Sequence, residues 1–291
     1  MSTRGAQHNL SGALWMVAAM AGFAIEDMLL KATVRHMPLG QALLIFGLIG
    51  MAVFSALAPC AGEGVFPAAA RSRSLLIRSG FEVAGRLFYS LAIALTPLSV
   101  ASAILQATPL VVVAGAALLF GETVGWRRWL AILAGFCGVL VILRPGLQGF
   151  DALSLVTVLG LIGFAGRDLA TRAAPPALSN RQLGLYGLGM LALAGAILTA
   201  VTGQVVVPDP LGGVLVLATA IFGIAAYFAL TVAMRTGEVS AVTPFRYTRL
   251  VFAMILGVAV FGESPDAATL LGSALVVGAG LYALLAGRAA P

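Results

Sequence analysis

The chain has 291 residues, of which 60% are apolar and only 10% are charged, and its mean hydropathy is +1.04. A water-soluble domain does not need so large an apolar fraction, so this composition excludes a soluble globular protein and indicates an integral membrane protein. The net charge of +6 does not call for a nucleic-acid partner, because the basic residues gather at the ends of the apolar stretches.

Long apolar stretches separated by short polar linkers fill almost the whole chain. A transmembrane helix needs about 20 mostly apolar residues. Lipid hydrocarbon cannot satisfy free backbone polar groups, so runs of this length must be helical, and the alternating pattern of an outer-membrane barrel is absent. The ten predicted spans are residues 10–30, 39–58, 75–95, 98–120, 128–143, 152–172, 182–202, 212–234, 239–261 and 268–286.

The two halves of the chain repeat each other at a constant offset. The hinge that begins at Phe120 returns at Phe261, 141 residues later, and Gly22 returns as Gly163 at the same offset. Five spans per copy is an odd number, so the second copy must enter the membrane with the opposite orientation. We therefore predict an all-α membrane protein of ten transmembrane helices in two inverted five-helix repeats, residues 1–146 (helices 1–5) and residues 147–291 (helices 6–10).

The distribution of Lys and Arg predicts the orientation in the membrane. With the N-terminus inside, three basic residues, Lys31, Arg35 and Arg144, fall in the outer segments. The inner segments hold ten: Arg4, Arg71, Arg73, Arg78, Arg127, Arg128, Arg172, Arg181, Arg235 and Arg288. Because positive charge accumulates on the cytoplasmic side, we expect a multi-pass protein of the inner or plasma membrane with both termini cytoplasmic.

Cysteine and histidine show no pattern that would hold a metal. Cys60 and Cys137 fall at or within predicted spans without CxxC spacing, and His8 and His36 lie near span ends. We therefore expect neither a metal nor a cofactor. The sequence carries no indication of an oligomeric state.

The first and sixth predicted spans carry charges at equivalent positions. Glu26 and Asp27 stand in span one, and Arg167 and Asp168 stand in span six, 141 residues later. Charged side chains inside a span are costly and face the protein interior or a water-filled cavity. Two interpretations stay open for these four residues: an ion-pair cluster that holds the halves together, or a relay that moves protons during transport.

Span three carries Arg78, Glu82 and Arg86 at four-residue steps, so these side chains share one helix face. They could pair internally, and that arrangement fits Arg78 and Glu82 near the cytoplasmic end. Arg86 lies deepest, and its guanidinium matches a carboxylate bidentately. It is therefore the first candidate to anchor an anionic group.

Spans four and nine contain prolines and polar residues. Gln106 and Pro109 lie in span four, and Pro244, Arg246 and Arg249 lie in span nine. A proline inside a span removes a helix hydrogen bond and kinks the helix. In total, four carboxylates within the spans face four arginines, Arg86, Arg167, Arg246 and Arg249, a balance that would suit a zwitterionic substrate better than a phosphate ester.

Several short motifs resemble a known transporter family. They are Thr96-Pro97, Thr108-Pro109-Leu110 and the Gly-Glu pairs Gly121-Glu122 and Gly262-Glu263. With the ten spans, they make each half similar to an EamA domain of the drug/metabolite transporter superfamily, most similar to YddG-type exporters of aromatic amino acids. The resemblance implies ten helices in inverted repeats and passage of small metabolites through a central cavity.

On this basis we expect a transporter that exports aromatic and other neutral amino acids by alternating access. Arg86, or Arg246 in its place, would hold the substrate carboxylate, and Gly22, Gly163, Pro109 and Pro244 would serve as hinges and gates. The remaining predicted substrate contacts are Trp15, Tyr89, Gln106, Phe164, Tyr227 and Tyr247. An exporter of another metabolite or a drug, with or without proton coupling, is the alternative. An enzyme is not expected, because HExxH and GxSxG motifs are absent.

Overall fold

The computed structural model describes residues 3–95, 104–105, 107–143, 154–261 and 267–286. Within these ranges there is no β-strand, and the longer helices match the ten predicted spans in order. These helices are α1 (Thr3–Thr33), α2 (Leu39–Cys60), α3 (Arg73–Leu95), α5 (Thr108–Phe120), α6 (Trp126–Leu143), α7 (Ser154–Arg172), α8 (Asn180–Thr202), α9 (Pro210–Arg235), α11 (Thr248–Phe261) and α12 (Ala267–Ala286). Three short elements join them: η1 (Ala68–Arg71), α10 (Val239–Val242) and η2 (Thr243–Tyr247).

Four of these helices, α1, α2, α8 and α9, are long and apolar enough to cross a membrane by length and composition alone, among the residues that the structure describes. The helices α3 and α7 carry buried charges, which lower their mean hydropathy although they lie in the same bundle. The chain is an all-α membrane protein with ten transmembrane helices in two inverted five-helix repeats.

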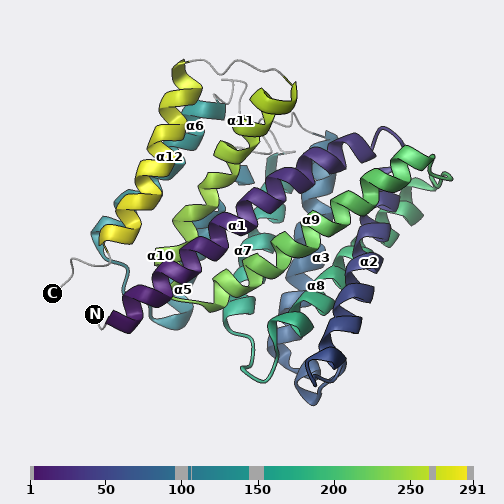
Figure 1. The fold of residues 1–291 in the computed structure, drawn as a ribbon. Helices are drawn as coiled ribbons and strands as arrows, with labels where there is room; N and C mark the ends of the chain where they lie inside the picture. Colours follow the sequence, from purple (N-terminus) through teal and green to yellow (C-terminus); the bar gives the residue numbers. More distant parts are fainter. Residues whose placement is uncertain (1–2, 96–103, 106, 144–153, 262–266, 287–291) are drawn as a thin grey trace.

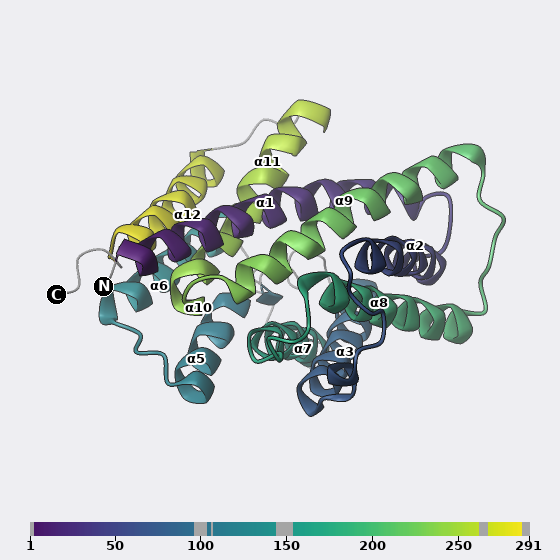
Figure 2. The same ribbon diagram turned by 60° about the horizontal axis from the view of Figure 1, so that its bottom comes forward.

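The helix pairing follows the internal repeat (Figures 1 and 2). Helix α1 packs along α9, while α7, the counterpart of α1, packs along α3, the counterpart of α9. Helices α2 and α8 pack on each other, as do α6 and α12, and each is the counterpart of its partner. The helix contacts therefore stay the same when the two halves are exchanged, as a pseudo-twofold axis requires.

Two glutamines at equivalent positions of the repeat make corresponding contacts with the opposite half. Gln41 of α2 binds the backbone of Val206, donating to its carbonyl at 2.7 Å and accepting from its N–H at 3.0 Å. Gln182 of α8 donates to the Gly64 carbonyl at 2.7 Å. Each glutamine thus fastens a linker of the other half, so the repeat extends to polar contacts at both ends of the bundle.

Glycines lie where the paired helices cross. A Cβ atom placed on Gly22 would lie 2.9 Å from the Cβ of Ala226, and one placed on Gly163 would meet the backbone of Gly85. Ala226 and Gly85 are themselves equivalent at the 141-residue offset. The two crossings are therefore related by the repeat, and the close approach of the helices depends on these glycines.

The two prolines stand at the starts of helical elements. Pro109 stands in the first turn of α5, where its missing N–H leaves no hydrogen bond unmade. Pro244 stands in the first turn of η2, and the predicted span 239–261 is divided into α10, η2 and α11. The gating role expected of both prolines stays a prediction.

Candidate substrate-binding site

The intramembrane charges gather in one place, the central charge cluster. Its members are Glu26 and Asp27 of α1, Arg78, Glu82 and Arg86 of α3, Arg167 and Asp168 of α7, Tyr227 of α9, Arg246 of η2 and Arg249 of α11. Arg78 is 1% exposed and belongs to the cluster, whereas the sequence placed it near the helix end. Five arginines therefore face four carboxylates here, so the formal balance among the described residues is one positive charge.

Glu82 is the centre of the cluster and has no exposed side-chain surface. Its Oε1 lies 3.3 Å from Nη1 of Arg167 and 3.5 Å from Nε of Arg86, and its Oε2 accepts a hydrogen bond from the Tyr227 hydroxyl at 2.5 Å. This carboxylate joins α3, α7 and α9. The internal pairing of Glu82 with Arg86, expected as one alternative, is present.

Arg78 reaches Glu82 only through Tyr227. Its Nη2 donates to the Tyr227 hydroxyl at 2.8 Å, and its Nε donates to Oγ1 of Thr171 at 2.8 Å. Tyr227 is 2% exposed, and its hydroxyl lies close to Gly187, which leaves it no room to turn. The Tyr227 hydroxyl is therefore hydrogen-bonded to protein groups on both sides, to Arg78 and to Glu82.

The charges on α7 and η2 form a second set of pairs. Asp168 accepts from Nε of Arg167 at 2.9 Å and pairs with Arg246 through its other oxygen. On the more exposed side, Asp27 pairs with Arg249. Three of the four residues proposed as an ion pair or relay are thus ion-paired, and neither member of the Glu26–Asp27 pair meets Arg167 directly.

Glu26 differs from the other carboxylates. It is 3% exposed, and the described residues offer it no hydrogen bond or ion pair within 4 Å. The charged groups that act on it electrostatically are Asp27, Arg86 and Arg249. A buried carboxylate without a direct partner is costly, so Glu26 is the member of the cluster best suited to meet a cationic group of a ligand.

Aromatic rings line the Arg86 side of the cluster. The Phe164 ring centre lies 5.1 Å from the guanidinium carbon of Arg167 and 5.7 Å from that of Arg86. Tyr89 meets Phe164 edge-to-face at a centroid distance of 5.8 Å. A ligand ring could contact these aromatic side chains by stacking or edge-to-face, and the neighbouring arginines could bind an anionic group.

The other predicted substrate contacts lie elsewhere. Tyr247 has no exposed surface, packs against Gly135 of α6 and donates to the Ile132 carbonyl at 3.3 Å. Trp15 is 40% exposed and meets Phe228 of α9 edge-on. It stands three helical turns from Glu26 on α1. Gln106 lies outside the described residues.

Three arginines of the cluster each keep one buried nitrogen without a hydrogen-bond acceptor among the described residues. They are Nη1 of Arg78, Nε of Arg86 and Nε of Arg246. Buried donors are almost always paired, and an unpaired one is unfavourable. The chemistry that satisfies such donors is a carboxylate or another oxyanion.

At one end of the bundle, Glu122, the acidic residue of the hinge after α5, binds the start of α10. Its two carboxylate oxygens accept from the backbone N–H groups of Val239 and Ser240 at 3.2 and 3.3 Å, at the start of α10. Arg128 of α6 donates to the Ser240 hydroxyl at 2.7 Å and pairs with Glu238. These contacts, here called the hinge latch, bind the two halves together. The repeated Gly-Glu pair was the sequence signal, but its partner could not be read from it.

The inverted helical repeat around a buried charge cluster defines a membrane transporter of small molecules. The chain belongs to the EamA-like transporter family, whose model matches residues 10–144 and 151–285. Its expected membership of the drug/metabolite transporter superfamily is thereby confirmed.

Named relatives cover between 67% and 93% of the chain. A riboflavin transporter of Rhizobium johnstonii is 28% identical over 93% of this chain and 90% of its own length. The pseudopaline exporter CntI of Pseudomonas aeruginosa is 27% identical over 92% of this chain and 93% of its own length. An S-adenosylmethionine uptake transporter of Rickettsia prowazekii is 26% identical over 67% of this chain and 65% of its own length.

A solved crystal structure supports the fold. It has a TM-score of 0.80 and 24% identity, and the match covers 96% of this chain and 99% of the other. The family and these relatives are transporters. None of the three named relatives is an exporter of aromatic amino acids, so the narrower resemblance expected from the sequence has no support from them.

Proposed function

We propose that the protein transports a small molecule that carries an aromatic ring and a carboxylate, with aromatic amino acids as the first candidates for export. The observation that carries this proposal is the position of Arg86. Its guanidinium lies 5.7 Å from the Phe164 ring, and its buried Nε forms a long ion pair with Glu82 at 3.5 Å but no hydrogen bond among the described residues. A carboxylate would satisfy that donor, and the substrate ring would lie against Phe164 and Tyr89.

The ammonium group of an amino acid has a matching partner in this arrangement. Glu26 is buried and lies within the electrostatic range of Arg86. A zwitterion would place its carboxylate on Arg86 and its ammonium on Glu26. Both buried groups would then gain partners without a change in net charge.

Movement would proceed by alternating access between the two halves. The hinge latch joins the two halves at one end of the bundle, and its hydrogen bonds would break in a form that is open at that end. The crossings at Gly22 and Gly163 would serve as the points about which the helices rock, because close backbone contact there allows rotation without large side chains in the way.

We further propose the inner or plasma membrane as the location, with both termini cytoplasmic. The support is the excess of arginine at one end of the bundle, the end that carries the hinge latch. We place the boundary between the repeats after residue 146, between the two segments matched by the family model.

A second candidate substrate is a heteroaromatic metabolite such as riboflavin. The similarity to riboflavin transporters over nine-tenths of the chain favours it. Riboflavin carries a large planar ring but no carboxylate. It would therefore use Phe164 and Tyr89 and would depend little on the charge of Arg86.

The test is counterflow in proteoliposomes loaded with unlabelled phenylalanine, tryptophan, riboflavin or S-adenosylmethionine. Wild-type protein is compared with Arg86→Gln and with Arg73→Gln, an exposed arginine on the same helix. One charge-assisted hydrogen bond is worth about 1.5–3 kcal/mol, which corresponds to an affinity loss of roughly 10–150-fold. We expect that loss for phenylalanine only in Arg86→Gln, and little difference between the proteins for phenylalaninamide.

Equal phenylalanine transport by wild type and Arg86→Gln would contradict the role of Arg86. Counterflow of riboflavin but of no amino acid would contradict the first candidate and favour the second. A pH gradient imposed in parallel experiments separates a facilitator, whose counterflow is indifferent to it, from a proton-coupled transporter.

A further inference from the structure

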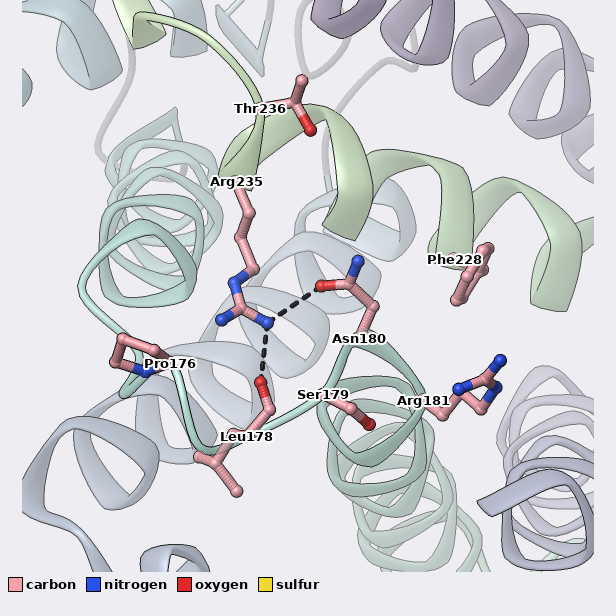
Figure 3. Close-up of a pocket in the computed structure, with 8 residues that line it drawn as sticks. All are labelled: Pro176, Leu178, Ser179, Asn180, Arg181, Phe228, Arg235 and Thr236. Atoms are coloured by element: carbon pink, nitrogen blue, oxygen red, sulfur yellow. Dashed lines mark hydrogen bonds between the residues drawn. The ribbon is translucent and has the colours of Figure 1, made fainter. Parts of the chain in front are cut away.

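A pocket of about 520 Å³ lies at the end of α9, and its lining includes no member of the central charge cluster (Figure 3). The end of α9 forms one wall and the connection between α7 and α8 forms the other. Its lining includes two arginines, Arg181 and Arg235, together with Ser179, Asn180 and Phe228. No carboxylate is among the residues that line it, so the pocket is cationic.

Arg235 is held in place by hydrogen bonds from one nitrogen of its guanidinium. Its Nη1 donates to the Leu178 carbonyl at 2.7 Å and to Oδ1 of Asn180 at 2.9 Å. Figure 3 shows the side chain extending from α9 toward both acceptors. Because both bonds start from the same nitrogen, the other N–H groups of the guanidinium remain able to bind an anion in the pocket.

A carboxylate outside the lining, Glu63, bonds to two of the lining residues. Glu63 accepts from Arg181 at 2.8 Å and from the Ser179 hydroxyl at 2.5 Å. It therefore offsets the charge of Arg181 and orients the start of α8. Arg235 has no such counter-ion among the described residues.

The apolar wall of the pocket continues onto the membrane-facing surface of α9. Leu217 and Ile221 are 52% and 64% exposed, and Phe228 and Arg235 follow at seven-residue intervals from Ile221, on the same side of the helix. Phe228 meets Trp15 of α1 edge-on at 6.4 Å. An apolar stripe that faces lipid thus ends at a cationic group. A phospholipid would match this surface, with its acyl chain along the stripe and its headgroup at the arginine.

The same end of the bundle is strongly basic. Contacts between helix ends join its residues: Ser74 of α3 donates to the Ala173 carbonyl at 3.2 Å, and Arg172 lies 3.9 Å from Glu122. This basic end holds Arg71, Arg73, Arg127, Arg128, Arg172, Arg181 and Arg235, against Glu63, Glu122 and Glu238. A basic surface between transmembrane helices on the cytoplasmic side meets a leaflet rich in anionic lipid.

We propose that this pocket binds an anionic phospholipid. The headgroup phosphate would accept from Arg235 and Asn180, and one acyl chain would lie along Phe228 and Ile221. A phosphate group could also come from a soluble metabolite, but the stripe that leads from the pocket into the membrane favours the lipid.

The test is native mass spectrometry of the full-length protein titrated with phosphatidylglycerol or with phosphatidylcholine of the same chains. We expect phosphatidylglycerol to bind roughly tenfold more tightly than phosphatidylcholine to the wild type. Arg235→Gln should remove that preference, while Arg73→Gln, on the same basic end but outside the pocket, should keep it.

A second variant tests the proposal even if Arg235→Gln fails to fold. Asn180→Asp places a carboxylate beside Arg235, which keeps the contact between α8 and α9 but neutralises the pocket. It should also lose the preference for phosphatidylglycerol. An equal loss in Arg73→Gln, or equal binding of the two lipids to the wild type, would overturn the proposal. Stabilisation by inorganic phosphate or glycerol phosphate that matches the effect of phosphatidylglycerol would assign the pocket to a soluble anion instead.

Discussion

Replacing Glu82 with glutamine should strongly destabilise the protein. The carboxylate has no exposed surface and serves Arg167, Arg86 and the Tyr227 hydroxyl at once. Glutamine keeps the shape and one acceptor oxygen but removes the negative charge. Two arginines then stay buried with their neutralising partner gone, and breaking a buried pair in this way costs about 3–5 kcal/mol.

The measurement is the melting temperature of the purified protein in one fixed detergent. A chain of this length shifts its Tm by about 2 °C for each kcal/mol, so we expect Glu82→Gln to lower it by roughly 6–10 °C. The matched control is Glu63→Gln, which removes a carboxylate whose side chain is 23% exposed and whose partner Arg181 is 41% exposed. Surface pairs of that kind contribute about 0–1 kcal/mol, so the control should lose no more than about 2 °C.

A double-mutant cycle with Tyr227→Phe isolates the contact between the hydroxyl and the carboxylate. Because the two groups are hydrogen-bonded at 2.5 Å, their effects should not add, with a coupling of about 0.5–3 kcal/mol. A Tm for Glu82→Gln equal to that of the Glu63 control would refute the reasoning. So would a Tyr227→Phe effect that is the same in both backgrounds.

Three further changes test the crossings, the hinge latch and the start of α9. Gly163→Ala adds a methyl group against backbone, so we expect a loss of about 1–3 kcal/mol and slower counterflow, whereas Gly213→Ala, which meets no atom within 4 Å, should leave both Tm and counterflow unharmed. Glu122→Gln leaves one oxygen for two backbone N–H groups, so hydrogen exchange at the Ser240 amide should become faster, and an unchanged exchange rate would argue against the latch. A backbone N–H bond and a nearby histidine lower the pKa of Asp209 below its ordinary 3.8. The stability that Asp209 adds is therefore complete above that pH and is lost as the pH falls through the lowered pKa. Asp209→Ala should accordingly lower Tm at pH 7, by an amount that shrinks below pH 3.8, and a gap that persists at lower pH would contradict this origin.

The fold could be predicted from the sequence because its two strongest signals are global. The length of each apolar run decides whether it can cross the membrane. The same 141-residue offset relates several segments of the first half to segments of the second half. Odd helix number then implies inversion without any three-dimensional information. Hydropathy does not show that helical elements start at Pro109 and Pro244, because the position of a helix start within an apolar run depends on local backbone hydrogen bonding.

The candidate site could be predicted in its composition but not in its pairings. A charge inside a span faces the protein interior or a cavity, so the sequence predicts an ion-pair cluster or a relay made of Glu26, Asp27, Arg167 and Asp168. It predicts Arg86 separately, as a substrate anchor. Which charge meets which depends on how each helix is rotated and shifted against its neighbours. Tyr227, expected to contact substrate, is held between Arg78 and Glu82, and no spacing along the chain predicts that contact.

The exchange of helix contacts between the two halves has a consequence for energetics. In a fully symmetric duplicated chain, the forms open to opposite sides would be copies of each other and would have equal free energy. Here the charges of α3 have no charged counterparts in the second half, because the residues equivalent to Glu82 and Arg86 at the 141-residue offset are Gly223 and Tyr227. If the protein works by alternating access as proposed, the forms open to opposite sides therefore differ in free energy, and the empty protein would rest in one of them before any substrate or gradient acts on it.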